Sequence, residues 1–191
     1  LVQLEKAVPG EEIFTDYDYA SSTSASFREH FAGLADWLWA EFELPQGARI
    51  CEIGSNDAIL LKPLAARGFN PIGVEPAKNL AKLAWGQGLE TINAFFDEAV
   101  VDTIGPGSAD VVVACNVFAH IEDIHGVLRN VKRVLKDDGV FVIEVQYLPK
   151  MLETLQFDNI YCEHIFYWSL RSLLEFMHAE DMMCIRAELI A

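Results

Sequence analysis

The stretch Arg49–Leu61, RICEIGSNDAILL, decides the fold of this chain. It opens with a short apolar run, residues 50–53, of the kind that buried parallel strands show. Gly54 then breaks the run, and Ser55-Asn56-Asp57 are residue types that favour turns and helix N-caps. Apolar residues recur at helical intervals from Ala58 onward. A strand, a glycine turn and a helix in this order predict the first βα unit of a nucleotide-binding sheet.

Two features of this unit suit a nucleotide. Gly54 has no Cβ, so its backbone can approach a ligand closely, and a helix start offers unpaired N–H groups to an anionic group. Glu75 follows the next apolar run, residues 71–74, about twenty residues further on, where an acidic side chain can accept hydrogen bonds from ribose hydroxyls.

The rest of the chain alternates between strand-like and helix-like runs. The first expected helix begins at Phe27 and ends near Pro45, and further helices are expected at 77–85, 97–103 and 123–135. Expected strands span 71–74, 89–94, 110–115 and 140–145, with a turn at 137–139 and a strand-like end at 184–191. Pro76 suits the start of the second of these helices. This alternation predicts an α/β fold with a doubly wound, mostly parallel, Rossmann-like sheet.

Ligands of such sheets bind at the carboxyl ends of the strands. That rule selects residues 54–57, Glu75, Phe95-Phe96, residues 116–120 and residues 144–147 as the candidate site.

Residues 14–24 are rich in aromatic, hydroxyl and acidic side chains and lack both the strand and the helix period, so we expect a loop. Two interpretations stay open. The loop is an irregular crossover whose rings cover the core, or it is a lid that presents Tyr17 or Tyr19 to a polar ligand. We therefore divide the chain into a lid loop and helix, 1–45, and a cofactor-binding core, 46–191.

Composition excludes several function classes. The chain has 191 residues, 52% hydrophobic content and a formal net charge of −15, which argues against nucleic acids and anionic membranes as partners. The four cysteines are far apart and form no cluster with histidine, so we expect no metal site and reduced thiols in the cytoplasm. No apolar run approaches the length of a membrane span, and no signal peptide is visible.

Two cofactor classes suit the site, dinucleotides and S-adenosylmethionine. Dinucleotide sites favour GxGxxG, so that two stretches of backbone close on a pyrophosphate. Here the turn has one glycine, and the acidic Asp57 behind it would repel a pyrophosphate. The pattern Glu52-x-Gly54 together with Glu75 resembles that of the class I S-adenosylmethionine-dependent methyltransferases. This resemblance implies S-adenosylmethionine as the cofactor and S-adenosylhomocysteine as the product.

Longer strings carry a narrower resemblance. They are FTDYDYASSTSAS (14–26), EIGSNDAILLKPLAARGFNPIGVEPAKNLA (52–81), VACNVFAHIED (113–123), FVIEVQYLPKML (141–152) and FDNIYCEHIFYWSLRSL (157–173). Together they resemble the nucleotide-sugar C-methyltransferases, which methylate C3 of a 4-keto deoxysugar carried on TDP in antibiotic-sugar pathways. The resemblance implies a nucleotide sugar as the small-molecule partner. It also implies an N-terminal four-cysteine zinc module and a further C-terminal domain, neither of which is complete in this chain. We expect a monomer or a weak dimer.

The chemistry needs a base, because the proton alpha to the ketone must leave C3 before that carbon can attack a methyl group. His164 is the candidate base, and His120 is the rival. Glu163 could orient the His164 ring or bind the sugar. The resemblance gives Asn116 a role in holding the sugar or its enolate oxygen.

The full set of expected contacts follows from the sheet edge and the resemblance. Expected catalytic residues are Asn116, His120, Tyr161, Glu163 and His164; expected cofactor contacts are Glu52, Gly54, Asn56, Asp57, Glu75, Pro76, Phe95, Phe96 and Asn116; expected substrate contacts are Tyr17, Tyr19, Ser22, Gln146 and Tyr147.

Three positions depart from the family pattern. Ala58 stands where glycine is common, Cys115 where an asparagine is frequent, and Cys162 where a histidine is frequent. Alternatives to a sugar C-methyltransferase are an O- or N-methyltransferase, since the sheet does not fix the acceptor atom, and a module that binds cofactor without turnover. A dehydrogenase is a further rival.

Overall fold

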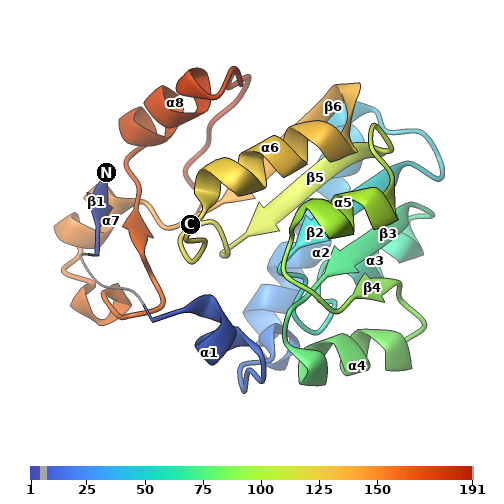
Figure 1. The fold of residues 1–191 in the computed structure, drawn as a ribbon, viewed down its shortest axis with the longest axis horizontal. Coiled ribbons are helices and arrows are strands. Elements are labelled where there is room, and N and C mark those ends of the chain that lie inside the picture. The colour runs from blue at the N-terminus through green and yellow to red at the C-terminus, as the bar shows by residue number, and fades with distance from the viewer. Residues whose placement is uncertain (5–7, 191) are drawn as a thin grey trace.

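The computed structural model describes residues 1–4 and 8–190 (Figure 1). Its elements are β1 (Val2–Gln3), α1 (Gly10–Phe14), the 3-10 turn η1 (Ser21–Thr23), α2 (Ala25–Phe42), β2 (Arg49–Ile53), α3 (Leu61–Ala66), β3 (Asn70–Val74), α4 (Lys78–Gly86), β4 (Thr91–Ile92), α5 (Glu98–Ile104), β5 (Ala109–Cys115), α6 (Ile124–Val134), β6 (Leu135–Glu144), α7 (Leu148–Glu153), the 3-10 turn η2 (Phe157–Asn159), β7 (Phe166–Tyr167) and α8 (Leu170–Ala179).

The main sheet has five strands in the order β4-β3-β2-β5-β6, and every neighbouring pair is parallel. The doubly wound α/β fold predicted from the sequence is confirmed. The chain leaves β2 toward β3 and β4 and then returns to β5 on the other side of β2, so strand order reverses between β2 and β5. Ligands of open α/β sheets bind at such a reversal.

Helices cover both faces of the sheet. α2 and α3 lie behind the sheet in Figure 1, and α5 and α6 lie in front of it. Phe31, Ala35 and Leu38 of α2 pack against Ile50 and other inward residues of the sheet, so α2 shares the core of residues 46–191. The division of the chain at residue 45 stays a prediction.

The segment after β6 returns to the end of β5. The backbone N–H groups of Ile165 and Phe166 both donate to the carbonyl of Ala119, at 2.8 and 3.1 Å. β7 then pairs antiparallel with β1 in a separate two-stranded sheet. These contacts bring residues 159–167 beside the carboxyl ends of the strands, where the sequence predicts the site.

Three expectations about secondary structure differ from the structure. Residues 184–190 form no strand, no strand among the described residues pairs with them, and their apolar side chains are exposed; Ala191, the last residue of the expected strand, lies outside the described residues. The expected strand 89–94 is reduced to β4, Thr91–Ile92, which pairs only with β3. The expected turn at 137–139 lies inside β6, where Ala109 pairs with Leu135 and Val111 with Val140, so residues 136–139 bulge out of the ladder.

The first sheet helix begins later than the sequence suggests. Asn56 and Ala58 have φ values of 50° and 70°, in the left-handed region, where a right-handed helix cannot run. α3 therefore begins at Leu61. Within the described residues, none of the helices combines the length and the hydropathy needed to cross a membrane.

Candidate active site

The turn after β2 lies at the reversal of strand order. Gly54 has φ of 69° and donates its N–H to the carbonyl of Val74, at 2.8 Å. A Cβ added at Gly54 would lie 2.9 Å from Cγ2 of Val117. Both the left-handed backbone and the close approach of the neighbouring loop therefore require glycine here.

Glu75, directly after β3, binds two backbone N–H groups of the loops that line the site. Its Oε2 accepts from the backbone N–H of Asn56 at 2.7 Å, and its Oε1 accepts from the backbone N–H of Ala77 at 2.8 Å. Burial raises the pKa of this carboxyl, while the two backbone N–H groups act in the opposite direction. Each carboxylate oxygen keeps a second lone pair that a ribose hydroxyl could use.

Glu52 is the most deeply buried acid of the site, with 2% of its surface exposed. Its Oε2 has no hydrogen-bond partner among the described residues. Burial raises its pKa well above the usual value, and the negative charges of Glu75 and Asp57 raise it further. A buried carboxyl oxygen without a partner costs free energy, so the site suits a ligand that brings a positively charged or hydrogen-bond-donating group.

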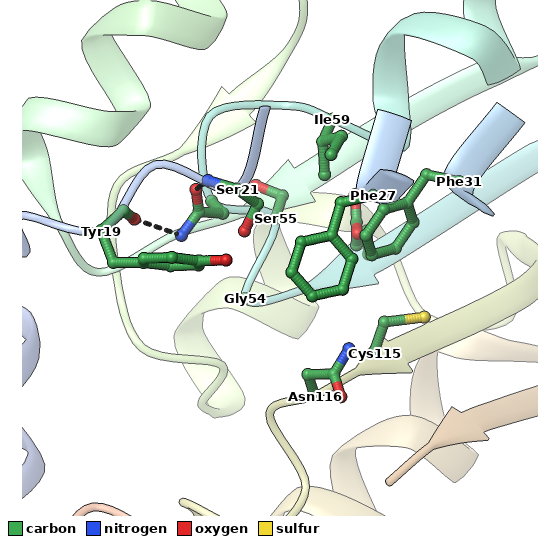
Figure 2. Close-up of a pocket in the computed structure, with 11 residues that line it drawn as sticks. Tyr19, Ser21, Phe27, Phe31, Gly54, Ser55, Ile59, Cys115 and Asn116 are labelled. Carbon is green, nitrogen blue, oxygen red and sulfur yellow. Dashed lines mark hydrogen bonds between the residues drawn. The ribbon is translucent and has the colours of Figure 1, made fainter. Parts of the chain in front are cut away.

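These residues surround a cavity of about 80 Å³ (Figure 2). Its lining residues are Tyr19, Ser21, Phe27, Phe31, Glu52, Gly54, Ser55, Asn56, Ile59, Cys115 and Asn116. The two phenylalanines come from the start of α2, so the N-terminal region supplies an apolar wall opposite the polar turn.

The loop before α2 lies across the turn. The N–H of Ser21 donates to Oδ1 of Asn56 at 2.9 Å, and Nδ2 of Asn56 donates to the carbonyl of Tyr19 at 3.0 Å. The N–H of Ser22 donates to both carboxylate oxygens of Asp57, at 3.3 and 3.2 Å. Residues 19–22 thus cover the candidate cofactor site. This arrangement favours the lid interpretation over a simple crossover.

Tyr17 links this lid to the segment before β7. Its hydroxyl donates to Oε2 of Glu163 at 3.0 Å. Its backbone N–H and carbonyl are both bonded to the side-chain amide of Asn79 in α4, at 3.2 and 2.8 Å. Burial and the Glu163 carboxylate raise the pKa of Tyr17, so the phenol stays protonated. Glu163 therefore hydrogen-bonds to the lid, and among the described residues no hydrogen bond joins it to the His164 ring. Its predicted roles, orienting this ring or binding the sugar, stay predictions.

His164 is buried, and both ring nitrogens have partners. Nδ1 lies 2.9 Å from the carbonyl of Asn159, and Nε2 lies 2.8 Å from the hydroxyl of Tyr161. A carbonyl can only accept, so Nδ1 carries the proton and Nε2 accepts from the tyrosine. Burial lowers the pKa of His164, although the Asn159 carbonyl and the Glu163 charge oppose this effect. The neutral ring thus holds a lone pair toward Tyr161, which is 40% exposed.

His120 packs against His164, with ring centroids 4.8 Å apart. Burial, together with the nearby His164, lowers its pKa to about 4. Its Nδ1 is buried and has no hydrogen-bond partner among the described residues. A group with so low a pKa is a weak base at neutral pH. His164, whose Nε2 accepts from the partly exposed Tyr161 hydroxyl, therefore stays the first candidate for the base.

Asn116 lies between the two parts of the site. It lines the cavity next to Gly54, and it also lines a smaller cavity with Ala119, Val145, Gln146 and His164. A methyl donor bound beside Gly54 and an acceptor bound beside His164 would therefore meet at Asn116.

Several predicted contacts lie outside both cavities. Phe96 is buried in the core against the sheet, and Phe95 is 42% exposed. Tyr147 precedes α7 and pairs with Trp168 through an isolated bridge, and Pro76 lies in the loop before α4. Conversely, Asn79 and Asn159 were not predicted. Both act through long-range or backbone contacts that spacing in the sequence does not reveal. Within residues 1–4 and 8–190, no group of three or more His, Cys, Asp or Glu side chains could hold a metal ion.

Comparison with known proteins agrees with this architecture. The model of a methyltransferase domain family matches residues 26–184. A SAM-dependent methyltransferase from Archaeoglobus fulgidus shares the fold with a TM-score of 0.66 at 19% identity, over 85% of this chain and 73% of that one.

Two curated relatives differ in acceptor chemistry. C-methyltransferase NovU from Streptomyces niveus is 36% identical over 97% of this chain and 44% of its own length. A ubiquinone biosynthesis O-methyltransferase from Azorhizobium caulinodans is 24% identical over 76% of this chain and 56% of its own length. The chain thus spans about half the length of these relatives. Because the family model covers most of the chain, including every strand of the main sheet, the protein belongs to the methyltransferase domain family.

Proposed function

We propose that this protein transfers a methyl group from S-adenosylmethionine to carbon, at C3 of a 4-keto deoxysugar carried on a nucleoside diphosphate. The observation that carries the proposal is the Tyr161–His164 pair. It supports the proposal because the Nε2 lone pair of the neutral His164 ring accepts from Tyr161, and His164 lines a cavity across Asn116 from the Gly54 turn.

The methyltransferase family implies S-adenosylmethionine as methyl donor, and the turn after β2 fits it. Gly54 leaves room for close approach, Glu75 can accept from ribose hydroxyls, and the unpartnered Oε2 of Glu52 can accept from an ammonium group. When bound, this cofactor supplies an electrophilic methyl group on a sulfonium.

The acceptor class rests on chemistry and similarity together. NovU is named as a C-methyltransferase and is the more similar of the two relatives described above. Carbon becomes nucleophilic only after a proton has left it, and a hydroxyl acceptor needs less help from a base. A buried histidine whose tautomer is fixed by Asn159 suits the more demanding reaction.

The proton has a short route. The C3 proton passes to the oxygen of Tyr161 while the hydroxyl proton of Tyr161 passes to Nε2 of His164, 2.8 Å away. This leaves an enolate on the sugar and an imidazolium next to the Asn159 carbonyl, and the tyrosine is neutral again. The lid lies across residues 56 and 57, where it would limit the access of water to the methyl donor.

The test separates proton removal from methyl transfer. The protein is incubated in D₂O with TDP-4-keto-6-deoxyglucose and S-adenosylhomocysteine, and loss of the C3 proton is followed by NMR. The wild type should exchange this proton, whereas Tyr161→Phe and His164→Asn should slow the exchange by roughly 100-fold or more, the usual contribution of an acid–base group. His178→Asn is the matched control, because His178 is exposed on α8.

Three results would redirect the proposal. If His164→Asn methylates as fast as the wild type, an O- or N-acceptor replaces the carbon. If the wild type binds S-adenosylhomocysteine but neither exchanges nor methylates, the chain is a cofactor-binding module without turnover on this sugar. If NADH binds and S-adenosylhomocysteine does not, the cofactor class is wrong.

A further inference from the structure

A chain of side-chain contacts runs from α2 to the junction of the two cavities. Nε2 of His30 lies 2.6 Å from Oε2 of Glu144, and Nδ2 of Asn116 donates to Oε1 of the same carboxylate at 3.0 Å. His30 comes from α2, Glu144 ends β6, and Asn116 follows β5. Three elements that are distant in the sequence therefore meet at one carboxylate.

The carboxylate decides how the Asn116 amide is turned. An ionised carboxylate only accepts hydrogen bonds, so it selects the NH₂ side of the amide. Among the described residues, no partner is bonded to the other end, Oδ1 of Asn116. The backbone is fixed as well, since Asn116 has φ of 55° and its N–H donates to the carbonyl of Glu144 at 2.8 Å. Asn116 thus keeps one acceptor oxygen free at the junction.

His30 holds the carboxylate from the other side. Without it, the Glu144 side chain could rotate about its terminal bond, because such torsions have broad minima. The neighbouring Phe31 is 5% exposed and Ala35 is fully buried, so α2 gives His30 a rigid base. The side chains of His30 and Glu144 are 33% and 18% exposed. Such partial burial is enough for a directional bond and leaves room for substitution.

We propose that Glu144, held by His30, is a positioning residue that orients the Asn116 amide. In this orientation Oδ1 of Asn116 accepts from an O–H or N–H donor of the bound sugar or the bound cofactor. This inference rests on the proposed methyl transfer. The donor belongs either to a sugar hydroxyl or to the ammonium group of the cofactor. The Michaelis constant for the sugar reports the first, and the affinity for S-adenosylhomocysteine reports the second.

Swapping the amide of residue 116 and the carboxylate of residue 144 between the two positions tests the proposal. In Asn116→Asp two carboxylates face each other, and kcat/KM should fall by roughly 100-fold, the cost of a charged group that has lost its donor. In Asn116→Asp with Glu144→Gln, the glutamine amide nitrogen donates to the new aspartate, and its oxygen accepts from His30. Charge and hydrogen bonds are then restored, and kcat/KM should return to within about tenfold of the wild type.

The control variants separate positioning from general damage. Glu144→Leu frees the Asn116 amide and should raise either the sugar KM or the S-adenosylhomocysteine dissociation constant by about tenfold. Glu90→Leu removes an exposed carboxylate at the opposite edge of the sheet, before β4, and should change neither value. Thermal melting establishes that each variant is folded. A folded double variant that is as impaired as Asn116→Asp, beside an active wild type, would overturn the proposal.

An activity-independent readout distinguishes this failure from failure of the proposed function. The side-chain NH₂ resonances of Asn116, assigned by NMR, should move in Glu144→Leu and in His30→Phe and stay in place in Glu90→Leu. If they do so while the wild type methylates no sugar, the network stands and the acceptor is wrong. If Glu144→Leu leaves these resonances unchanged, Glu144 does not position Asn116. This second readout also decides the matter if Asn116→Asp fails to fold.

Discussion

His120 gives the protein a pH-dependent stability that can be worked out from the structure. Its pKa is lowered from 6.5 to about 4 in the folded protein, chiefly by burial. The unfolded chain therefore binds the proton more readily between these two values, and the stability present above pH 6.5 is lost as the pH falls toward 4. Linkage over this shift gives a loss of about 2 kcal/mol between pH 7.5 and pH 5.0.

Urea unfolding at the two pH values measures this loss, and pH 5.0 stays above the isoelectric point of about 4.6. Buried carboxyls such as Glu52 titrate too, so the comparison is with His120→Asn, which keeps them. The free energy of unfolding of the wild type should fall by about 2 kcal/mol more than that of the variant. Equal losses in the two proteins would refute the burial of a neutral His120.

Three further predictions concern the turn and the lid. Gly54→Ala should cost about 1–2 kcal/mol in the free energy of unfolding and abolish S-adenosylhomocysteine binding; unchanged binding by calorimetry would contradict the close approach. Ala58→Gly should lower the free energy of unfolding by less than about 0.5 kcal/mol, because glycine adopts the left-handed conformation of residue 58 without strain. Ala81→Gly in α4 should lower it by about 1–2 kcal/mol; equal losses in urea unfolding would argue against a left-handed backbone at Ala58. Tyr17→Phe should raise the sugar KM about tenfold through loss of the Glu163 contact while S-adenosylhomocysteine affinity stays within about twofold; a reversed pattern in steady-state and calorimetric data would place Tyr17 at the cofactor instead.

Local patterns predicted the central strands β2, β3 and β5 well because these strands are buried on both faces. The run Asp110–Cys115 is continuously apolar after its first residue, and β5 occupies nearly the same residues. Where pairing partners are absent, the patterns misled. Residues 184–190 alternate like a strand, but no described strand pairs with them. A strand needs a neighbour, and its own sequence cannot supply one.

The site residues were likewise predictable only in part. Gly54 and Glu75 could be found because each follows its strand directly, at the edge where ligands of such sheets bind. The contacts that set their neighbours could not be found. Glu163 bonds to Tyr17, which is distant in the sequence, and Asn159 acts on His164 through a backbone carbonyl. Neither contact leaves a mark in residue type or spacing.

Calorimetric titration of S-adenosylhomocysteine into the wild type and into Glu75→Ala tests most directly that the turn after β2 and the end of β3 form the cofactor site. The wild type should bind with micromolar affinity, Glu75→Ala should bind at least about tenfold more weakly, and the exposed control Glu90→Ala should match the wild type. A wild type that does not bind, or a folded Glu75→Ala variant that binds equally well, would contradict the site assigned here.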